Sequence, residues 1–131
     1  MSQENVKIVR RILDGWARGD FSVGADLLTP DFEWHQFPQA VEPGTRRGAD
    51  VGAALSKMFD VYEGLRVEAK EFIDAGDKVV VIGRATATAK GSGLRLDNPV
   101  ALVWTLREGR LARNEVFTDG REALEAAGLS G

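Results

Sequence analysis

The sequence predicts an α+β fold, in which helices cover one face of a curved antiparallel sheet. Apolar residues recur at three- and four-residue steps in N-terminal segments, which is the spacing of amphipathic helices. From residue 65 they alternate with period two, which is the spacing of strands. Glycine-containing turn sequences separate these later runs, as in antiparallel hairpins. The concave side of such a sheet is either filled by side chains or left as a pocket.

Length and composition indicate one soluble globular domain. The 131 residues suffice for one core and are too few for two ordinary domains, so we expect a single domain over residues 1–131. Hydrophobic residues make up 44% and charged residues 28%, a globular composition. The apolar run VVVI at 79–82 is far shorter than the roughly 18 residues of a membrane span. The polar N-terminus MSQENVKIVRR lacks the apolar core of a secretory signal, so we expect a cytoplasmic location.

Residue counts also exclude several kinds of site. The chain has no cysteine, which excludes thiol catalysis, disulfides and cysteine metal sites. Its only histidine, His35, argues against a zinc site, because such sites usually take several His or Cys ligands. A net charge of -3 without a basic run argues against nucleic acid. We therefore expect no metal, no cofactor, no nucleic-acid partner and no membrane partner.

The first part of the chain is predicted to form two helices and a strand. The first helix covers residues 3–18 and has one apolar face. That face holds Val6, Val9, Ile12, Leu13 and Trp16. A second, short helix is predicted at about 22–28, before a Thr-Pro-Asp turn at 29–31. In the following FEWHQF, aromatic and polar residues alternate as in a strand.

The remaining elements follow a proline- and glycine-containing segment, residues 38–48, which is predicted to be a loop. Asp50 is expected to cap a third helix. The apolar face of that helix holds Val51, Ala54, Leu55, Met58 and Tyr62. Four antiparallel strands and a terminal helix come next, separated by turns at 75–77, 91–93 and 107–110. The alternation slips before Phe72, which predicts a β-bulge.

This order of elements resembles the SnoaL-like branch of the nuclear transport factor 2-like superfamily. The resemblance is carried by ILDGWARGD, DFEWH, GADVGAALSKMF, AGDKVVVIGRATAT, PVALVWTLREGRL and FTDGREALEAAGL, and so covers nearly the whole chain. It implies a cone-shaped, strongly curved antiparallel sheet wrapped around the N-terminal helices, with an internal pocket. The branch includes ketosteroid isomerases, limonene-epoxide-type hydrolases and polyketide cyclases, so the resemblance does not imply one chemistry.

The resemblance places ketosteroid isomerase positions on three residues of this chain. The tyrosine of the first helix corresponds to Ile12, the general-base aspartate to Gln36, and the protonated acid of the oxyanion hole to Ala101. An amide cannot abstract a proton and an alanine cannot donate one. The resemblance therefore implies that this isomerase mechanism is absent.

The epoxide hydrolase positions are also largely replaced. The arginine and two aspartates of those enzymes correspond to Arg84, Thr86 and Val116, so only the arginine is kept. If the acid of SnoaL-type cyclases corresponds to Val116, it is missing as well. A register error of one residue would reverse these assignments, because it turns every side chain to the other face.

Two charged residues are candidates for catalysis. Asp119 is either a general acid or base at the end of the last strand, or the first residue of a capping box with Glu122, and we favour the cap. Arg84 interrupts the largely apolar run VVVIGRATATA. It either faces the cavity, where it needs an anionic or carbonyl-bearing partner, or faces solvent.

Ten residues are predicted to line the pocket from the helices and strands. They are Trp16, Trp34, Gln36, Tyr62, Arg84, Thr86, Ala101, Asn114, Val116 and Thr118. The aromatic ones are either ordinary core or the floor for a ring-shaped ligand. Gln36 and Asn114 could orient a ligand by hydrogen bonds. By parity, His35 and Trp104 are expected on the convex face, where an exposed tryptophan would favour a homodimer, as the resemblance also implies.

The sequence thus predicts a protein that binds a small apolar molecule, cyclic or carbonyl-containing, in the cone. One alternative is an enzyme of isomerase, polyketide cyclase or epoxide hydrolase type that uses Arg84, Gln36 and Asp119. Another is a purely structural role, which would need a cavity packed shut by the same aromatic residues.

Overall fold

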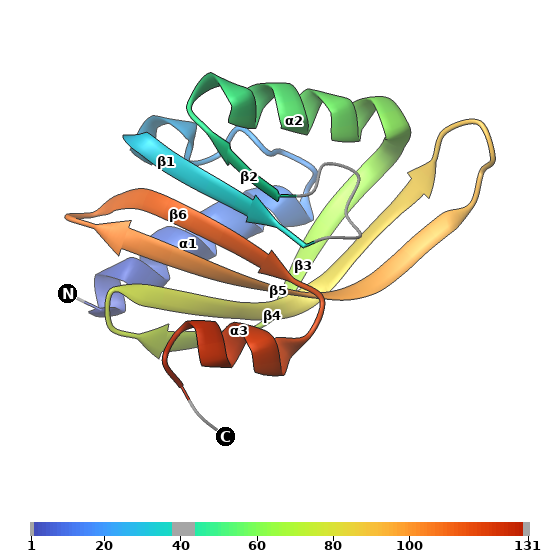
Figure 1. Cartoon of the computed structure of the whole chain (residues 1–131). Helices are drawn as coiled ribbons and strands as arrows, with labels where there is room; N and C mark the ends of the chain where they lie inside the picture. The colour runs from blue at the N-terminus through green and yellow to red at the C-terminus, as the bar shows by residue number, and fades with distance from the viewer. Residues whose placement is uncertain (1, 38–43, 130–131) are drawn as a thin grey trace.

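The computed structural model describes residues 2–37 and 44–129, which form three α-helices and one six-stranded sheet (Figure 1). The helices are α1 (Ser2–Ala17), α2 (Ala49–Val61) and α3 (Gly120–Ala126), with a 3₁₀ helix η1 (Ala25–Leu27). The strands are β1 (Leu28–Gln36), β2 (Gly44–Arg47), β3 (Tyr62–Ala75), β4 (Lys78–Ala89), β5 (Arg95–Arg107) and β6 (Arg110–Phe117). The α+β prediction is confirmed.

The sheet has the strand order β2-β1-β6-β5-β4-β3. Strands β3 to β6 form an antiparallel meander whose three turns lie where the sequence predicts them. Strand β1 joins β6 in parallel, with Trp34 opposite Asn114, and β2 adds to the outer edge of β1. Helices α1 and α3 lie on opposite faces of the sheet (Figure 1). Both faces of the central strands are therefore covered.

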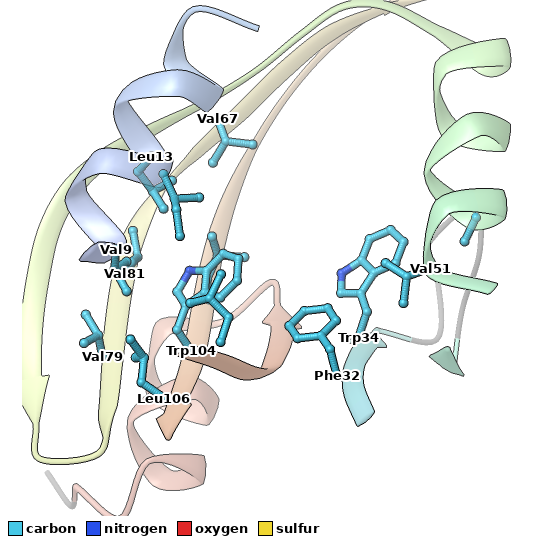
Figure 2. Packing of buried hydrophobic residues seen from close by; sticks show 14 residues of the cluster. Val9, Leu13, Phe32, Trp34, Val51, Val67, Val79, Val81, Trp104 and Leu106 are labelled. Atoms are coloured by element: carbon cyan, nitrogen blue, oxygen red, sulfur yellow. The ribbon is translucent and has the colours of Figure 1, made fainter. Parts of the chain in front are cut away.

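The main core lies inside the curved sheet. Val9 and Leu13 of α1 pack toward Val79 and Val81 of β4, and Trp104 lies between this group and Trp34 of β1 (Figure 2). A second apolar cluster lies on the opposite face, beneath α3. It consists of Val80, Ala101, Val103 and Ala123, with partly buried residues around them. Burial of apolar area on both faces stabilises the central strands.

The curvature of the sheet coincides with irregular pairing of β3. Its register shifts between Ala69 and Glu71, which confirms the predicted bulge. Gly83 of β4 lies opposite this bulge, and a Cβ atom there would lie 2.1 Å from the carbonyl oxygen of Glu68. Only glycine allows the two backbones to approach this closely.

Several local predictions were wrong. The predicted second helix is reduced to η1, and the predicted turn at 29–31 belongs to β1. Residues 44–47, predicted as part of a loop, form β2, because pairing with β1 supplies hydrogen bonds that the sequence does not signal. The rest of that loop, residues 38–43, lies outside the described residues. Helix α2 begins one residue before Asp50, and Gly48 is its N-cap.

The described helices include none that is long and apolar enough to cross a membrane. The longest, α1, has 16 residues and carries charged residues on one side.

Candidate ligand-binding site

A cavity of about 480 Å³ opens between the concave face of the sheet and the helices. Apolar and aromatic side chains make up most of its wall, and among the described residues no charged side chain lines it. The wall consists of Trp16, Phe21, Trp34, Gln36, Phe37, Leu55, Met58, Tyr62, Leu65, Val67, Ala85, Thr86, Ala87, Leu96, Asn98, Pro99, Val100, Leu102, Asn114, Val116 and Thr118. Both the volume and this composition are typical of small-molecule sites.

Eight of the ten residues that the sequence assigned to the pocket line this cavity. They are Trp16, Trp34, Gln36, Tyr62, Thr86, Asn114, Val116 and Thr118. The strands β1 and β6 bring four of them together, because alternate residues of adjacent parallel strands point to the same side. The sequence left open whether the aromatic residues belong to the core or form part of a ligand pocket. Trp34 does both, since it is a core residue and also lines the cavity.

Ala101 does not line the cavity, and the predicted parity of β5 was wrong. Ala101 is buried on the opposite face under α3, whereas Trp104, expected to be exposed, is only 3% exposed and lies in the inner core. The strand is apolar at both parities because both of its faces are covered, so alternation gave no guide to its orientation. Its cavity-facing neighbours Val100 and Leu102 are also apolar, so the correction does not restore an acid at this place.

Arg84 lies outside the cavity. Its side chain is 45% exposed, and its Nε donates to Oδ1 of Asp97 at 2.7 Å. A second bond runs from Nη2 to the carbonyl oxygen of Asp97. The arginine therefore has a partner on the neighbouring strand β5, which the sequence did not reveal because the two residues are 13 positions apart.

Asp119 is the N-cap of α3. Its exposed carboxylate accepts a hydrogen bond of 2.9 Å from the backbone N–H of Arg121, as the capping interpretation predicts. Within the described part of the chain, Glu122 does not return the second bond of a capping box. Asp119 does not line the cavity, although its neighbour Thr118 does.

A polar cluster occupies the outer face of β1, β2 and β6. Glu33 pairs with His35 Nε2 at 2.8 Å and with Arg47 at 2.8 Å. Arg113 Nε donates to the same imidazole nitrogen, Nε2, at 3.1 Å. Thr45 completes the contacts of the imidazole. The hydrogen bond with His35, followed by that from Arg47, lowers the pKa of Glu33. His35 therefore lies away from the cavity, as its parity predicts.

Several polar atoms of the cavity wall are buried without a hydrogen-bond partner. They include Trp16 Nε1, Gln36 Oε1 and Asn114 Oδ1. The amide nitrogen of Gln36 makes only a 3.7 Å contact with the sulfur of Met58. An unpaired buried polar atom is costly, so these atoms lower the stability of this part of the wall.

Some wall residues were not singled out from the sequence. Leu65, Val67, Leu96 and Asn98 line the cavity from the long strands β3 and β5, and Phe21 lines it from the segment after α1. The alternation of Leu65 and Val67 was the available signal for β3. Phe21 carries no such signal, because it lies in a turn that tertiary packing places against Trp16, with ring centroids 5.1 Å apart.

The described residues contain no group of three or more His, Asp or Glu side chains arranged to hold a metal ion.

A family profile described as SnoaL-like domain matches residues 9–114. The chain belongs to the SnoaL-like family. Among curated proteins, none matches the sequence.

Solved structures of this SnoaL-like protein's relatives agree in fold. An NTF2-like protein from Burkholderia thailandensis E264 is 27% identical, with a TM-score of 0.78, covering 93% of this chain and 95% of that one. TerC, co-crystallised with polyporic acid, is 26% identical with a TM-score of 0.73, covering 95% and 98%. A protein from Jannaschia sp. CCS1, described as a candidate SnoaL-like polyketide cyclase, is 26% identical with a TM-score of 0.74, covering 96% and 92%.

Proposed function

We propose that this SnoaL-like protein binds an uncharged, largely apolar small molecule that contains a ring system. The observation that carries this proposal is the cavity of about 480 Å³, whose described wall has no charged side chain. A charged ligand group entering it would lose its hydration without gaining an ionic partner, which is costly. Aromatic walls such as Trp16 and Trp34 favour a planar ring, because ring faces and edges pack well against one another.

Two further observations support a binding role. The cavity is open rather than packed shut, which argues against a purely structural use of the cone. The relative TerC was crystallised with polyporic acid, so a fold of this kind accommodates a small organic molecule in at least that protein.

Catalysis is the second candidate, favoured by the relative described as a candidate polyketide cyclase. Arg84 and Asp119, the charged residues that the sequence offered for this role, lie outside the cavity. Tyr62 is the only described wall residue with an ionisable side chain, and Gln36 can orient but not titrate. Any chemistry would therefore depend on hydrogen bonds and ligand orientation rather than on an acid–base pair.

Equilibrium dialysis with naphthalene and 2-naphthoate tests the proposal, because the two probes share a ring system and differ in charge. We expect naphthalene to bind at least tenfold more tightly than the anion. Ala85→Phe, which fills the cavity wall, should abolish binding, whereas Thr88→Phe on the same strand, outside the wall, should not. Equal binding by both probes, or unchanged binding in Ala85→Phe, would contradict the proposal. Turnover of an added polyketide would instead favour the catalytic candidate.

The homodimer stays a prediction. That prediction rested partly on an exposed Trp104, and this premise is wrong, since Trp104 is buried. The outer-face cluster of Glu33, His35, Thr45, Arg47 and Arg113 is the surface that such a dimer would use, and sedimentation of the purified protein tests it.

A further inference from the structure

The cavity wall becomes steadily more exposed along strand β5. Leu102 is 2% exposed, Val100 is half-buried and Asn98 is exposed. All three line the cavity, because they are alternate residues on one side of the strand. In Figure 1, β5 runs from the projecting β4–β5 hairpin into the body of the sheet, so its first residues lie outermost. The cavity therefore has a deep end at Leu102 and a mouth at Asn98.

The neighbouring strand β6 shows the same change. Asn114 is 2% exposed, Val116 is half-buried, and Thr118, just after the strand, is exposed. All three line the cavity. The two strands are antiparallel, with Leu102 opposite Val116, so exposure rises toward the same end on both. Asn98 and Thr118 therefore both lie at the mouth.

The two exposed residues at the mouth are polar and are free to bind a ligand group. Neither side chain has a hydrogen-bond partner among the described residues. The amide of Asn98 and the hydroxyl of Thr118 can each donate and accept a hydrogen bond. Either can therefore pair with an uncharged oxygen, whether it belongs to a hydroxyl or to a carbonyl group.

The deep end offers a polar ligand group much less. Its wall is mostly apolar, and Trp16 Nε1 and Asn114 Oδ1 have almost no accessible surface, so a ligand cannot reach these two atoms. A hydroxyl or carbonyl group placed there would lose its hydration, which is costly. At the mouth the same group keeps contact with water and can also bond the protein.

We propose that Asn98 and Thr118 bind a hydroxyl or carbonyl oxygen of the ligand at the mouth, so that the apolar end of the ring system enters first. This inference rests on the proposed function and adds the position of the ligand's polar group. A carboxylate is more strongly hydrated than a hydroxyl and meets no positive charge among the described wall residues, so the preference for uncharged ligands is unchanged.

Nuclear Overhauser contacts between the protein and 2-naphthol, which is un-ionised at neutral pH, test the orientation directly. The ring protons beside the hydroxyl should contact the methyl group of Thr118. The ring protons at the opposite end should contact the methyl groups of Leu102. The reverse pattern would overturn the proposal.

A comparison of 2-naphthol with naphthalene tests the two side chains. In the double variant Asn98→Ala/Thr118→Val, the affinity for 2-naphthol relative to naphthalene should fall about fivefold, because hydrogen bonds that replace bonds to water contribute modestly. Both positions are exposed, so the fold should be kept, and circular dichroism checks this. Thr88→Val, on β4 outside the wall, is the control and should leave the ratio unchanged.

The outcomes distinguish the two proposals. If naphthalene does not bind the unaltered protein, the proposed function itself fails. If naphthalene binds but the double variant changes the ratio less than about twofold, the proposed function stands and the site at the mouth is overturned. A fall in the ratio together with the expected contacts of Thr118 and Leu102 would support both.

Discussion

Replacing Asp119 separates its role as a helix cap from any role as a catalytic acid. Asp119→Ala removes the acceptor of the 2.9 Å bond from the N–H of Arg121. Loss of such a cap costs about 1 kcal/mol. An unfolding entropy of about 2.1 cal/mol/K per residue, applied to 131 residues, converts this into a fall in Tm of about 4 °C. Asp119→Asn should stay within about 1 °C of the parent, because asparagine caps equally well.

The assay is thermal unfolding followed by circular dichroism, combined with dialysis of naphthalene at a temperature where all variants are folded. Because Asp119 does not line the cavity, both variants should bind the probe as the parent does. The reasoning is refuted if Asp119→Asn loses binding or turnover while keeping its Tm. That result would mean that the carboxylate acts chemically and that its contact with α3 is incidental.

Three further outcomes are expected. Gly83→Ala should destabilise the fold by about 3 kcal/mol in urea unfolding, because its Cβ would lie 2.1 Å from the backbone oxygen of Glu68. Arg84→Ala should cost less than about 1 kcal/mol and leave naphthalene binding unchanged, since its ion pair with Asp97 is largely exposed. The stability difference between the parent and Glu33→Gln should be present at neutral pH and shrink as the pH falls below about 4, because the pKa of Glu33 is lowered in the folded protein.

Each of these has a control or a contrary result. Gly52→Ala is the control for Gly83→Ala, because nothing lies within 4 Å of its added Cβ, and alanine should stabilise the exposed position in α2 by about 0.5–1 kcal/mol. Weakened naphthalene binding in Arg84→Ala would indicate that the arginine contacts the ligand in the cavity. A Glu33→Gln difference that grows toward acid pH would mean that the ion pairs of Glu33 do not stabilise the fold.

Where one face of a strand is polar, the sequence alone was sufficient. In β1 the apolar Trp34 alternates with Glu33 and His35, and in β6 Asn114 and Val116 alternate with charged neighbours. In the structure Trp34, Asn114 and Val116 lie in the wall of the cavity, on the side that this alternation indicates. Periodicity gave the order of helices and strands, and the resemblance to the SnoaL-like family then implied the cone-shaped fold.

Where both faces are buried, alternation disappears. In β5 the run PVALVW contributes Leu102 and Trp104 to the inner core and Ala101 and Val103 to the cluster under α3. The run is apolar on both faces and so does not indicate which set of alternate residues faces inward. The prediction that Ala101 lies in the pocket and Trp104 on the surface therefore had no support from alternation. The position of α3, a distant segment, decided the matter.

The sequence by itself determined the class of fold, the helical and strand periods, and the absence of thiol chemistry. Tertiary structure alone decided that Arg84 pairs with Asp97 across two strands, that residues 44–47 complete the sheet, and that Asn114 is paired with Trp34 on one side and with Trp104 on the other. The physical reason is that these features depend on pairing partners distant along the chain. Local periodicity reports only whether a side chain is buried, and not which neighbour it meets.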